Sequence, residues 1–304
     1  NEIEGEILNL QQVRSSIARH LGLQIAGLVH SDRHIDGIVE MMLDATQQFN
    51  KPLTDERLFG WHNAMFPSGR SGIYKILVGQ WRKGPMLVVS GGIGKEKIHF
   101  EAPDADVLNN EMSKFLKWLN QETNIDPVLK AALAHFWFVT IHPFDDGNGR
   151  IARAIADMLL SRADDTNQRF YSMSAQIQKE RTDYYNILES SQKGSLDITQ
   201  WMEWFLLCLQ RAILSSEETL TAIFKKAQFW ERFSQEPINV RQKTMLNKML
   251  DGFEGKLTAA KWAKITKTSH DSALRDIQQL IHMGILVQDA AGRSTHYIIH
   301  LNSQ

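Results

Sequence analysis

Apolar residues recur at helical spacing along most of the first 225 residues. Residues 6–21 place Ile7, Val13, Ile17 and Leu21 toward one face of a helix, and residues 34–49 repeat the pattern. The same period returns over the ranges 104–122, 126–144, 149–163, 180–192 and 197–230. The pattern predicts a mainly α domain over residues 1–225, built as a helical bundle.

Two parts of the chain depart from this helical period. Residues 86–90 and 97–100 are short β-branched runs around the Gly-rich turn GGIGKE, and they predict a small β-hairpin. Residues 226–304 read as a separate unit, with three helical patterns and then two strands around a Gly-containing turn. Three helices followed by a β-wing are typical of a winged helix-turn-helix domain.

The composition bounds the class of protein. The chain has 304 residues, of which 43% are hydrophobic, and a net charge of −1, so no whole-molecule attraction to nucleic acid or to an anionic membrane is expected. Its one cysteine, Cys208, lies in an apolar run and is predicted to be buried. Without a signal-like or membrane-spanning segment, we expect a cytoplasmic protein with no membrane partner. Because the sequence starts at Asn1 without an initiator Met, we expect that it begins inside a longer protein.

The candidate chemistry lies in residues 140–160, TIHPFDDGNGRIARAIADMLL. An apolar helix ends there inside the protein, and a second helix begins at the Gly-Asn-Gly triplet. Backbone amides at a helix N-terminus lack intrahelical partners and favour an anion. Arg150 and Arg153 are three residues apart, so they share one face, and guanidinium groups suit phosphate oxygens. The pattern therefore predicts a polyphosphate site.

Two further residues of this loop complete a reactive site. Asp146 directly precedes the triplet, and a carboxylate beside bound phosphates is a usual anchor for Mg²⁺. His142 lies four residues upstream, and imidazole is suited to take a proton from a hydroxyl near neutral pH. Each feature alone is an ordinary cap, turn or solvated face. Together they indicate group transfer from a nucleoside triphosphate to a hydroxyl.

At these residues the sequence resembles the Fic family, whose motif is His-Pro-Phe-x-Asp/Glu-Gly-Asn-Gly-Arg-x-x-Arg. The stretch from His142 to Arg153 matches this motif without departure, and the resemblance covers roughly residues 1–220. It implies a helical domain with a β-hairpin flap over the site. It also implies a nucleotidyltransferase that moves AMP from ATP to a Ser, Thr or Tyr hydroxyl of a protein, and that protein could be the enzyme itself.

The resemblance also implies a role for each motif residue. His142 would be the general base, Asp146 the Mg²⁺ ligand, and Phe144 the anchor of the loop. The hairpin would clamp the target by strand addition. The adenine pocket would be lined by Tyr185 or Tyr184, although core packing is the alternative for either, and Gln192 replaces the family's usual Asn. The phosphates of ATP would be held by Gly147, Asn148, Gly149, Arg150 and Arg153.

A second family feature involves the first residues, NEIEGE. Many Fic proteins carry an inhibitory helix, Ser/Thr-x-x-x-Glu-Gly/Asn, whose Glu pairs with the second motif arginine. Here Glu4-Gly5 matches the end of that pattern, and its Ser/Thr position would precede Asn1. The resemblance therefore implies autoinhibition, in which Glu4 and the γ-phosphate of ATP compete for Arg153.

The C-terminal unit has duplex DNA as a candidate partner. His270, Ser272 and Arg275 of its recognition helix could reach bases, and Arg293 and Ser294 of the wing could contact a backbone. Asp271 and Asp276 of the same helix would repel phosphates. Winged helices also serve as protein-docking or dimer modules, so a homodimer is a further candidate.

Three alternatives to AMP transfer remain open. A Doc-type kinase binds ATP in the reverse sense, but its motif typically replaces the second glycine by Lys, and Gly149 argues against it. Removal of AMP, with Glu4 orienting a water, cannot be separated from forward transfer by residues alone. A DNA-binding regulator that only senses ATP would call for a more basic recognition helix than this one.

Overall fold

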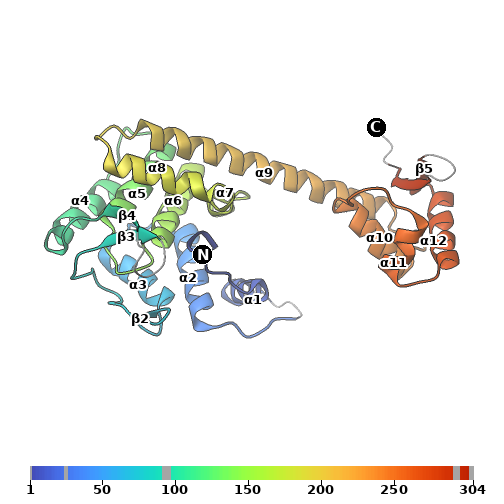
Figure 1. Cartoon of the computed structure of the whole chain (residues 1–304), viewed down its shortest axis with the longest axis horizontal. Coiled ribbons are helices and arrows are strands. Elements are labelled where there is room, and N and C mark those ends of the chain that lie inside the picture. Colours follow the sequence, from blue (N-terminus) through green and yellow to red (C-terminus); the bar gives the residue numbers. More distant parts are fainter. Residues whose placement is uncertain (1, 24–26, 91–96, 290–294, 301–304) are drawn as a thin grey trace. The chain divides into compact units, whose positions relative to one another are not determined.

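The computed structural model describes residues 2–23, 27–90, 97–289 and 295–300. The predicted turn 91–96 and the predicted wing residues Arg293 and Ser294 lie outside these ranges. The chain is mainly helical, as predicted, and separates into two compact units, Asn1–Ser216 and Glu217–Gln304. Helix α9, Thr199–Arg232, spans this boundary (Figure 1). None of the helices in the described ranges has the length and apolarity needed to cross a bilayer.

The N-terminal unit begins with a short 3-10 helix, η1, which is followed by helices and two small hairpins (Figure 1). Its remaining elements are α1 Leu10–His20, α2 Arg33–Gln47, α3 Asp55–Met65, β1 Arg70–Ser71, β2 Tyr74–Lys75, β3 Leu87–Ser90, β4 Lys97–Glu101, η2 Ala105–Val107, α4 Leu108–Asn120, α5 Pro127–Ile141, α6 Asn148–Asp164, α7 Met173–Lys179 and α8 Arg181–Lys193. η1 itself spans Glu2–Glu4.

Helices α5 and α6 form the centre of this unit and lie side by side (Figure 1). Helix α5 begins after Asp126, whose carboxylate caps the first amides, and Pro127 follows where no amide hydrogen is needed. The α6 residues Ile151, Ile155, Met158 and Leu159 are all buried, as predicted. The loop between the two helices, which carries the predicted chemistry, is partly buried, with Phe144 in the core and Asp146 reaching solvent.

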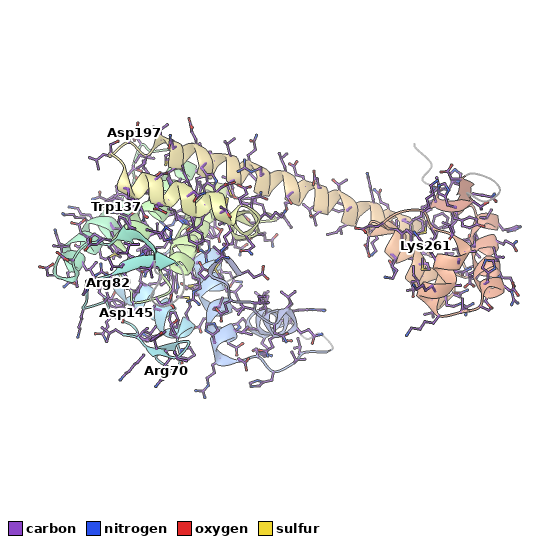
Figure 2. The ribbon with its side chains drawn as sticks, viewed as in Figure 1. Arg70, Arg82, Trp137, Asp145, Asp197 and Lys261 are labelled. Atoms are coloured by element: carbon purple, nitrogen blue, oxygen red, sulfur yellow. The ribbon has the colours of Figure 1, made fainter. Side chains whose placement is uncertain are left out.

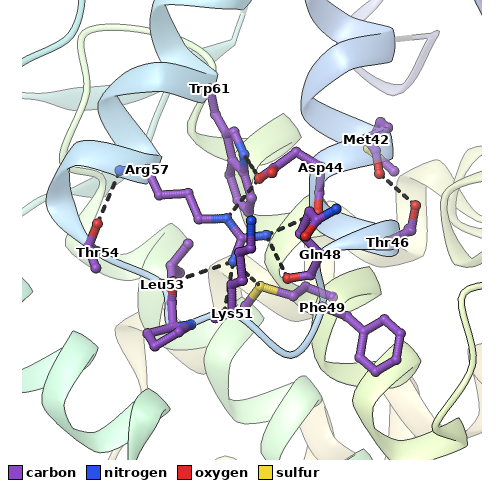
Figure 3. A network of polar contacts seen from close by, with 12 residues as sticks. Met42, Asp44, Thr46, Gln48, Phe49, Lys51, Leu53, Thr54, Arg57 and Trp61 are labelled. Atoms are coloured by element: carbon purple, nitrogen blue, oxygen red, sulfur yellow. Dashed lines mark hydrogen bonds and ion pairs between the residues drawn. The ribbon is translucent and has the colours of Figure 1, made fainter. Parts of the chain in front are cut away.

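A polar network fixes α3 against its neighbours (Figure 3). The Asp44 carboxylate on α2 accepts hydrogen bonds from Arg57 Nε and from Trp61 Nε1, both at 2.7 Å. The remaining nitrogens of Arg57 donate to the carbonyl oxygens of Asp44, Gln48, Lys51 and Pro52. An arginine that bonds four carbonyl oxygens and one carboxylate locks the turn between α2 and α3. That turn sets the position of α3, which carries part of the site.

The predicted hairpin is confirmed, with β3 and β4 paired antiparallel and a register shift between Val88 and Val89. The segment before this hairpin, residues 72–81, is mostly without strand structure. Only Tyr74–Lys75 forms a strand there, and it pairs with Arg70–Ser71. Beyond that point two backbone amides bond to side chains instead of a neighbouring strand. Leu77 N–H donates to Asp145 and Gly79 N–H donates to His62. Side chains of α3 and of the loop between α5 and α6 therefore hold this segment in place.

The second unit contains the three predicted helices, here α10 Val240–Leu250, α11 Ala259–Thr266 and α12 His270–His282. Two strands follow, β5 Leu286–Asp289 and β6 His296–Ile299, and they pair antiparallel. The order of elements matches the expected one, and the assignment as a winged helix stays a prediction. A separate apolar core around Trp262 and Ile277 holds the unit together.

One expectation for this unit is wrong. Asp276 was expected to repel phosphates from the exposed face of α12, yet its side chain is buried. Its carboxylate accepts two bonds from Arg241, at 2.9 and 3.0 Å, and one from Asn239. Burial alone raises the pKa of Asp276, but these hydrogen bonds outweigh burial and lower it. Of the two acidic residues expected on that face, Asp271 is the one that is exposed.

Candidate functional site

The site is built where α5 ends. His142 closes the helix in the left-handed conformation, with φ of 51°, which non-glycine residues adopt only where the surroundings impose it. Its ring Nδ1 lies 3.0 Å from the carbonyl oxygen of Val139. A carbonyl only accepts, so Nδ1 carries the hydrogen, and the neutral ring presents Nε2 as an acceptor. Burial lowers the pKa of His142, which favours that neutral form.

Arg82 ties the loop that follows α5 to the base of the hairpin. Its Nε donates to the carbonyl oxygen of His142 at 2.8 Å, and its backbone amide donates to Pro143 at 2.9 Å. The other guanidinium nitrogens donate to the carbonyl oxygens of Gly84 and Pro103, on either side of the hairpin. Arg82 is buried. It lies near Asp145, and both residues are labelled in Figure 2. One side chain thus fixes His142 and both ends of the hairpin.

His62 supports the loop from α3. The amide of Gly79 donates to its Nδ1 at 3.2 Å, so Nε2 carries the hydrogen and donates to the carbonyl oxygen of Asp146 at 3.1 Å. The ring stacks on Phe144, with centroids 4.2 Å apart. Burial lowers the pKa of His62 to about 4. A neutral histidine with this tautomer positions the Asp146 backbone, and Phe144 is fully buried, as predicted for the anchor of the loop.

The start of α6 presents its backbone amides. The first intrahelical bond runs from Ile151 N–H to Gly147 carbonyl oxygen at 3.0 Å, so the amides of 148–150 precede the helical ladder. The side chain of Asn148 is buried and bonds both the amide and the carbonyl of Phe144, at 2.9 and 2.8 Å. Asn148 therefore closes the loop with its side chain, and an anion could reach only its backbone N–H.

A carboxylate already lies over these amides. Glu4 Oε1 is 2.6 Å from Nη2 of Arg153, which is buried on the second turn of α6. A Cβ added to Gly149 would lie 3.0 Å from the same Glu4 oxygen, so glycine at this position allows the close approach. Among the described residues, Nη1 of Arg153 has no hydrogen-bond partner. Glu4, Gly149 and Arg153 thus meet at the helix start, the arrangement that the inhibitory hypothesis requires.

Arg150 and Asp146 form the other side of the cradle. Arg150 is buried, lies over the ring of Phe66 at 4.9 Å, and its Nη2 is 3.6 Å from Asp146 Oδ1. The same oxygen accepts from Gly147 N–H at 2.5 Å, and Asp146 Oδ2 accepts from the Ser71 hydroxyl. The carboxylate is therefore oriented before any ligand arrives. Its 40% exposure leaves lone pairs open to solvent.

The residues around Asp146 suit a magnesium ion that is held mainly by phosphates and water. Within the described ranges no group of three or more His, Cys, Asp or Glu side chains gathers as a metal cage. One oriented carboxylate beside a phosphate cradle is the usual protein contribution to Mg²⁺ in such sites. The predicted metal ligand Asp146 is thus placed as the prediction needs, and its role stays a prediction.

Comparison with known proteins identifies the domain that holds this loop. The family model described as "Fic/DOC family" matches residues 52–160, which include the whole motif from His142 to Arg153. This chain carries a Fic/DOC family domain. A second model, described as a domain of unknown function (DUF4172), matches residues 1–23, the part that carries Glu4.

Named relatives and solved structures agree with the Fic assignment. The proteins called protein adenylyltransferase Fic from Drosophila melanogaster and Drosophila erecta are each 36% identical over 104 residues, or 34% of this chain. The chain spans only about a fifth of their length, since the match covers 20% and 19% of them.

Among solved structures, a Fic family protein from Desulfovibrio desulfuricans is similar over 100% of this chain and 84% of its own, with a TM-score of 0.53 and 19% identity. A Fic domain protein from Bacteroides thetaiotaomicron has the same TM-score and 22% identity over 71% of this chain and 82% of its own. At such identities the two structures support the fold alone.

The two tyrosines of α8 differ in what they offer to a ligand of the Fic domain. Tyr184 is buried, its hydroxyl lies 2.9 Å from His135 Nε2, and burial raises its pKa. Tyr185 is 41% exposed, and its hydroxyl donates to the carbonyl oxygen of Ile3 at 3.3 Å. Tyr185 is therefore accessible to a ligand and Tyr184 is not, and the adenine contact of either stays a prediction. Gln192 bonds the Thr140 hydroxyl at 3.2 Å.

Sequence reasoning missed several residues of this site, three of which are Arg82, His62 and His135. Arg82 and His62 hold the motif loop, and His135 contacts Tyr184 within the core. All three lie outside the motif, and their partners are 49 or more positions away along the chain, apart from the His62–Gly79, Arg82–Gly84 and Arg82–Pro103 bonds. Lone histidines and arginines in apolar or loop segments carry no local signal. Only the partners that they reach in the fold identify them.

Proposed function

We propose that this protein transfers AMP from ATP to a hydroxyl side chain of a protein, and that Glu4 restrains the reaction. The observation that carries the proposal is the loop between α5 and α6. There a neutral imidazole, helix amides without intrahelical partners and two buried guanidinium groups belong to one motif. This combination provides a base and a cradle for several phosphate charges.

In the proposed reaction, Nε2 of His142 accepts the proton of the target hydroxyl. The hydroxyl oxygen forms a bond to the α-phosphorus, and the bond between that phosphorus and the α,β-bridging oxygen breaks. Pyrophosphate leaves with the charge that develops, and Arg150, Arg153 and the α6 amides stabilise it. A Mg²⁺ bound at Asp146 would neutralise phosphate charge when present. Nδ1 keeps its bond to Val139, so the ring stays oriented while the proton moves.

The exposed edge of the hairpin suggests how a protein target could bind. Among the described residues β3 and β4 pair only with each other, so each has an unpaired edge, and Leu87, Val89 and Ile98 are 43%, 46% and 54% exposed. An extended segment that pairs with such an edge gains main-chain hydrogen bonds and pockets for alternate side chains. Arg82 fixes the hairpin to the His142 loop, so a bound strand would lie at a set distance from Nε2. We therefore propose a protein substrate that presents its hydroxyl on an extended segment.

Parallel incubations with ATP labelled at the α or the γ position test the reaction class. The wild type, Glu4→Gly and His142→Ala proteins are each incubated with Mg²⁺ and candidate targets. We expect α-label on protein, more of it with Glu4→Gly and almost none with His142→Ala. Label from the γ position alone would identify phosphoryl transfer instead. Release of AMP from modified protein without forward labelling would identify AMP removal.

The acid limb of the rate profile tests the protonation state of His142. Burial lowers the pKa of His142 from 6.5, so the ring stays neutral, and able to accept a proton, below that pH. We expect the acid-side fall in kcat/KM of the Glu4→Gly variant to have its midpoint below pH 6.5. Rates measured between pH 5 and 8 check this. A midpoint at or above pH 6.5 would contradict a base whose pKa is lowered by burial.

Replacement of Arg82 tests whether it positions the base. We expect Arg82→Gln in the Glu4→Gly background to lower kcat about 100-fold, because a displacement of about 1 Å in a reacting group has such an effect. The affinity for ATP should change little, since Arg82 contacts the His142 side of the loop. Exposed Lys83→Gln is the matched control. A parallel loss of ATP affinity would show that Arg82 only maintains the fold.

A further inference from the structure

The first motif arginine is also contacted by a carboxylate from the N-terminal segment. Glu6 Oε2 lies 3.4 Å from Nη1 of Arg150, two positions beyond Glu4 in the sequence. The two glutamates thus meet the two arginines one to one, Glu4 with Arg153 and Glu6 with Arg150. Neither the family motif nor the sequence pattern singled out Glu6.

We propose that Glu6 is a second inhibitory carboxylate, which occupies the face of Arg150 where a phosphate of the triphosphate tail would bind. This inference rests on the proposed function, because it assumes that the arginines hold the tail of ATP. Two carboxylates with two negative charges stand in for two phosphate groups. ATP has to displace both to gain both guanidinium contacts, so removal of Glu4 alone opens only half of the cradle.

His34 on α2 holds Glu6 in this position. Its Nε2 is 2.7 Å from Glu6 Oε1, and its Nδ1 is 2.6 Å from the carbonyl oxygen of Met65. Both partners are acceptors, and both ring nitrogens can donate only when the imidazole is doubly protonated. A ring with hydrogens on both nitrogens would donate to both acceptors and hold the Glu6 carboxylate in place. Glu6 thus lies between His34 and Arg150.

The rest of the segment keeps both carboxylates at the site. Ile3 is buried in the core of the unit, and its carbonyl oxygen accepts the hydroxyl of Tyr185. Since Glu4 and Glu6 follow this anchored residue, neither has to order a mobile segment to reach its arginine. Low ordering cost makes a weak ion pair effective as a competitor.

The contact distances rank the two effects. Glu4 is 28% exposed and lies 2.6 Å from Arg153, whereas Glu6 is 40% exposed and lies 3.4 Å from Arg150. A partly exposed ion pair is weak. We therefore expect Glu6→Gln to tighten ATP binding by about threefold, and Glu4→Gln to have the larger effect.

The test compares ATP and AMP as ligands, with Mg²⁺ present, by calorimetry. The proteins are Glu4→Gln, Glu4→Gln/Glu6→Gln and the control Glu4→Gln/Glu2→Gln. Glu2 is an exposed acidic residue of the same 3-10 helix, so its variant matches the charge change without changing the cradle. We expect the Glu6 substitution to tighten ATP binding about threefold and to leave AMP binding unchanged, since AMP has no β- or γ-phosphate. The Glu2 substitution should change neither.

A His34→Gln substitution provides an independent check. It should tighten ATP binding in the Glu4→Gln background, but have no further effect once Glu6 is replaced, because both act through one contact. Equal ATP affinity with and without Glu6, or equal gains for ATP and AMP, would overturn the inference. Tighter ATP binding without any AMP transfer would support Glu6 and instead refute the proposed reaction.

Discussion

Replacement of His142 by alanine is expected to reduce AMP transfer by about 10²- to 10⁴-fold, the usual contribution of a positioned general base. The physical reason is that Nδ1 is engaged by Val139 O, so Nε2 is the ring atom that can accept the hydroxyl proton. The measurement is the initial rate of AMP incorporation in the Glu4→Gly background, where inhibition does not obscure the loss.

Two further measurements make the His142 result specific. ATP affinity of the His142→Ala variant should remain close to that of its parent, because the phosphates bind the α6 amides and the arginines. An exposed histidine of the same unit, His30, serves as control, and His30→Ala should leave the rate unchanged. A His142→Ala protein that still transfers AMP at the parent rate would show that another group takes the proton.

Replacement of Glu4 by glycine is expected to raise AMP transfer about 10- to 100-fold. The Glu4 carboxylate lies 2.6 Å from buried Arg153 and directly over Gly149. A hydrogen bond to a charged group contributes about 1.5–3 kcal/mol, and ATP has to replace this contact to reach Arg153. Initial rates of α-label incorporation for wild type and variant provide the measurement.

Controls separate competition at Arg153 from a general loosening of the segment. Glu2→Gly removes a charge and adds the same backbone freedom in the same 3-10 helix, and it should leave the rate near that of the wild type. Glu4→Gln keeps the backbone and should raise the rate by a smaller factor. Equal rates for wild type and Glu4→Gly would remove the autoinhibition hypothesis and leave the site assignments intact.

Much of the fold and of the site could be predicted because it is encoded locally. The apolar period of α5 and α6 is continuous. The Gly147-Asn148 pair in the motif between them marks where α6 begins. Glu4 could be placed only through the family resemblance. The hairpin followed from β-branched runs on both sides of a glycine-rich turn.

Other features depend on contacts that no local pattern encodes. The sequence predicts no role for the segment before the hairpin, where the amides of Leu77 and Gly79 bond to Asp145 and His62 of other elements. Asp276 is expected from the sequence to repel DNA phosphates, but it is buried and bonded to Arg241 of α10. Long-range polar partners of this kind override local propensity, and they become visible only when the fold brings them together.

The central claim is that the start of α6, with Arg150 and Arg153, binds the triphosphate of ATP. Calorimetric titration of the Glu4→Gly variant with ATP, in the presence and absence of Mg²⁺, tests it most directly. We predict Mg²⁺-dependent binding of ATP that is at least about tenfold tighter than binding of AMP, since only ATP reaches both arginines. Absence of ATP binding, or equal affinities for ATP and AMP, would contradict the claim.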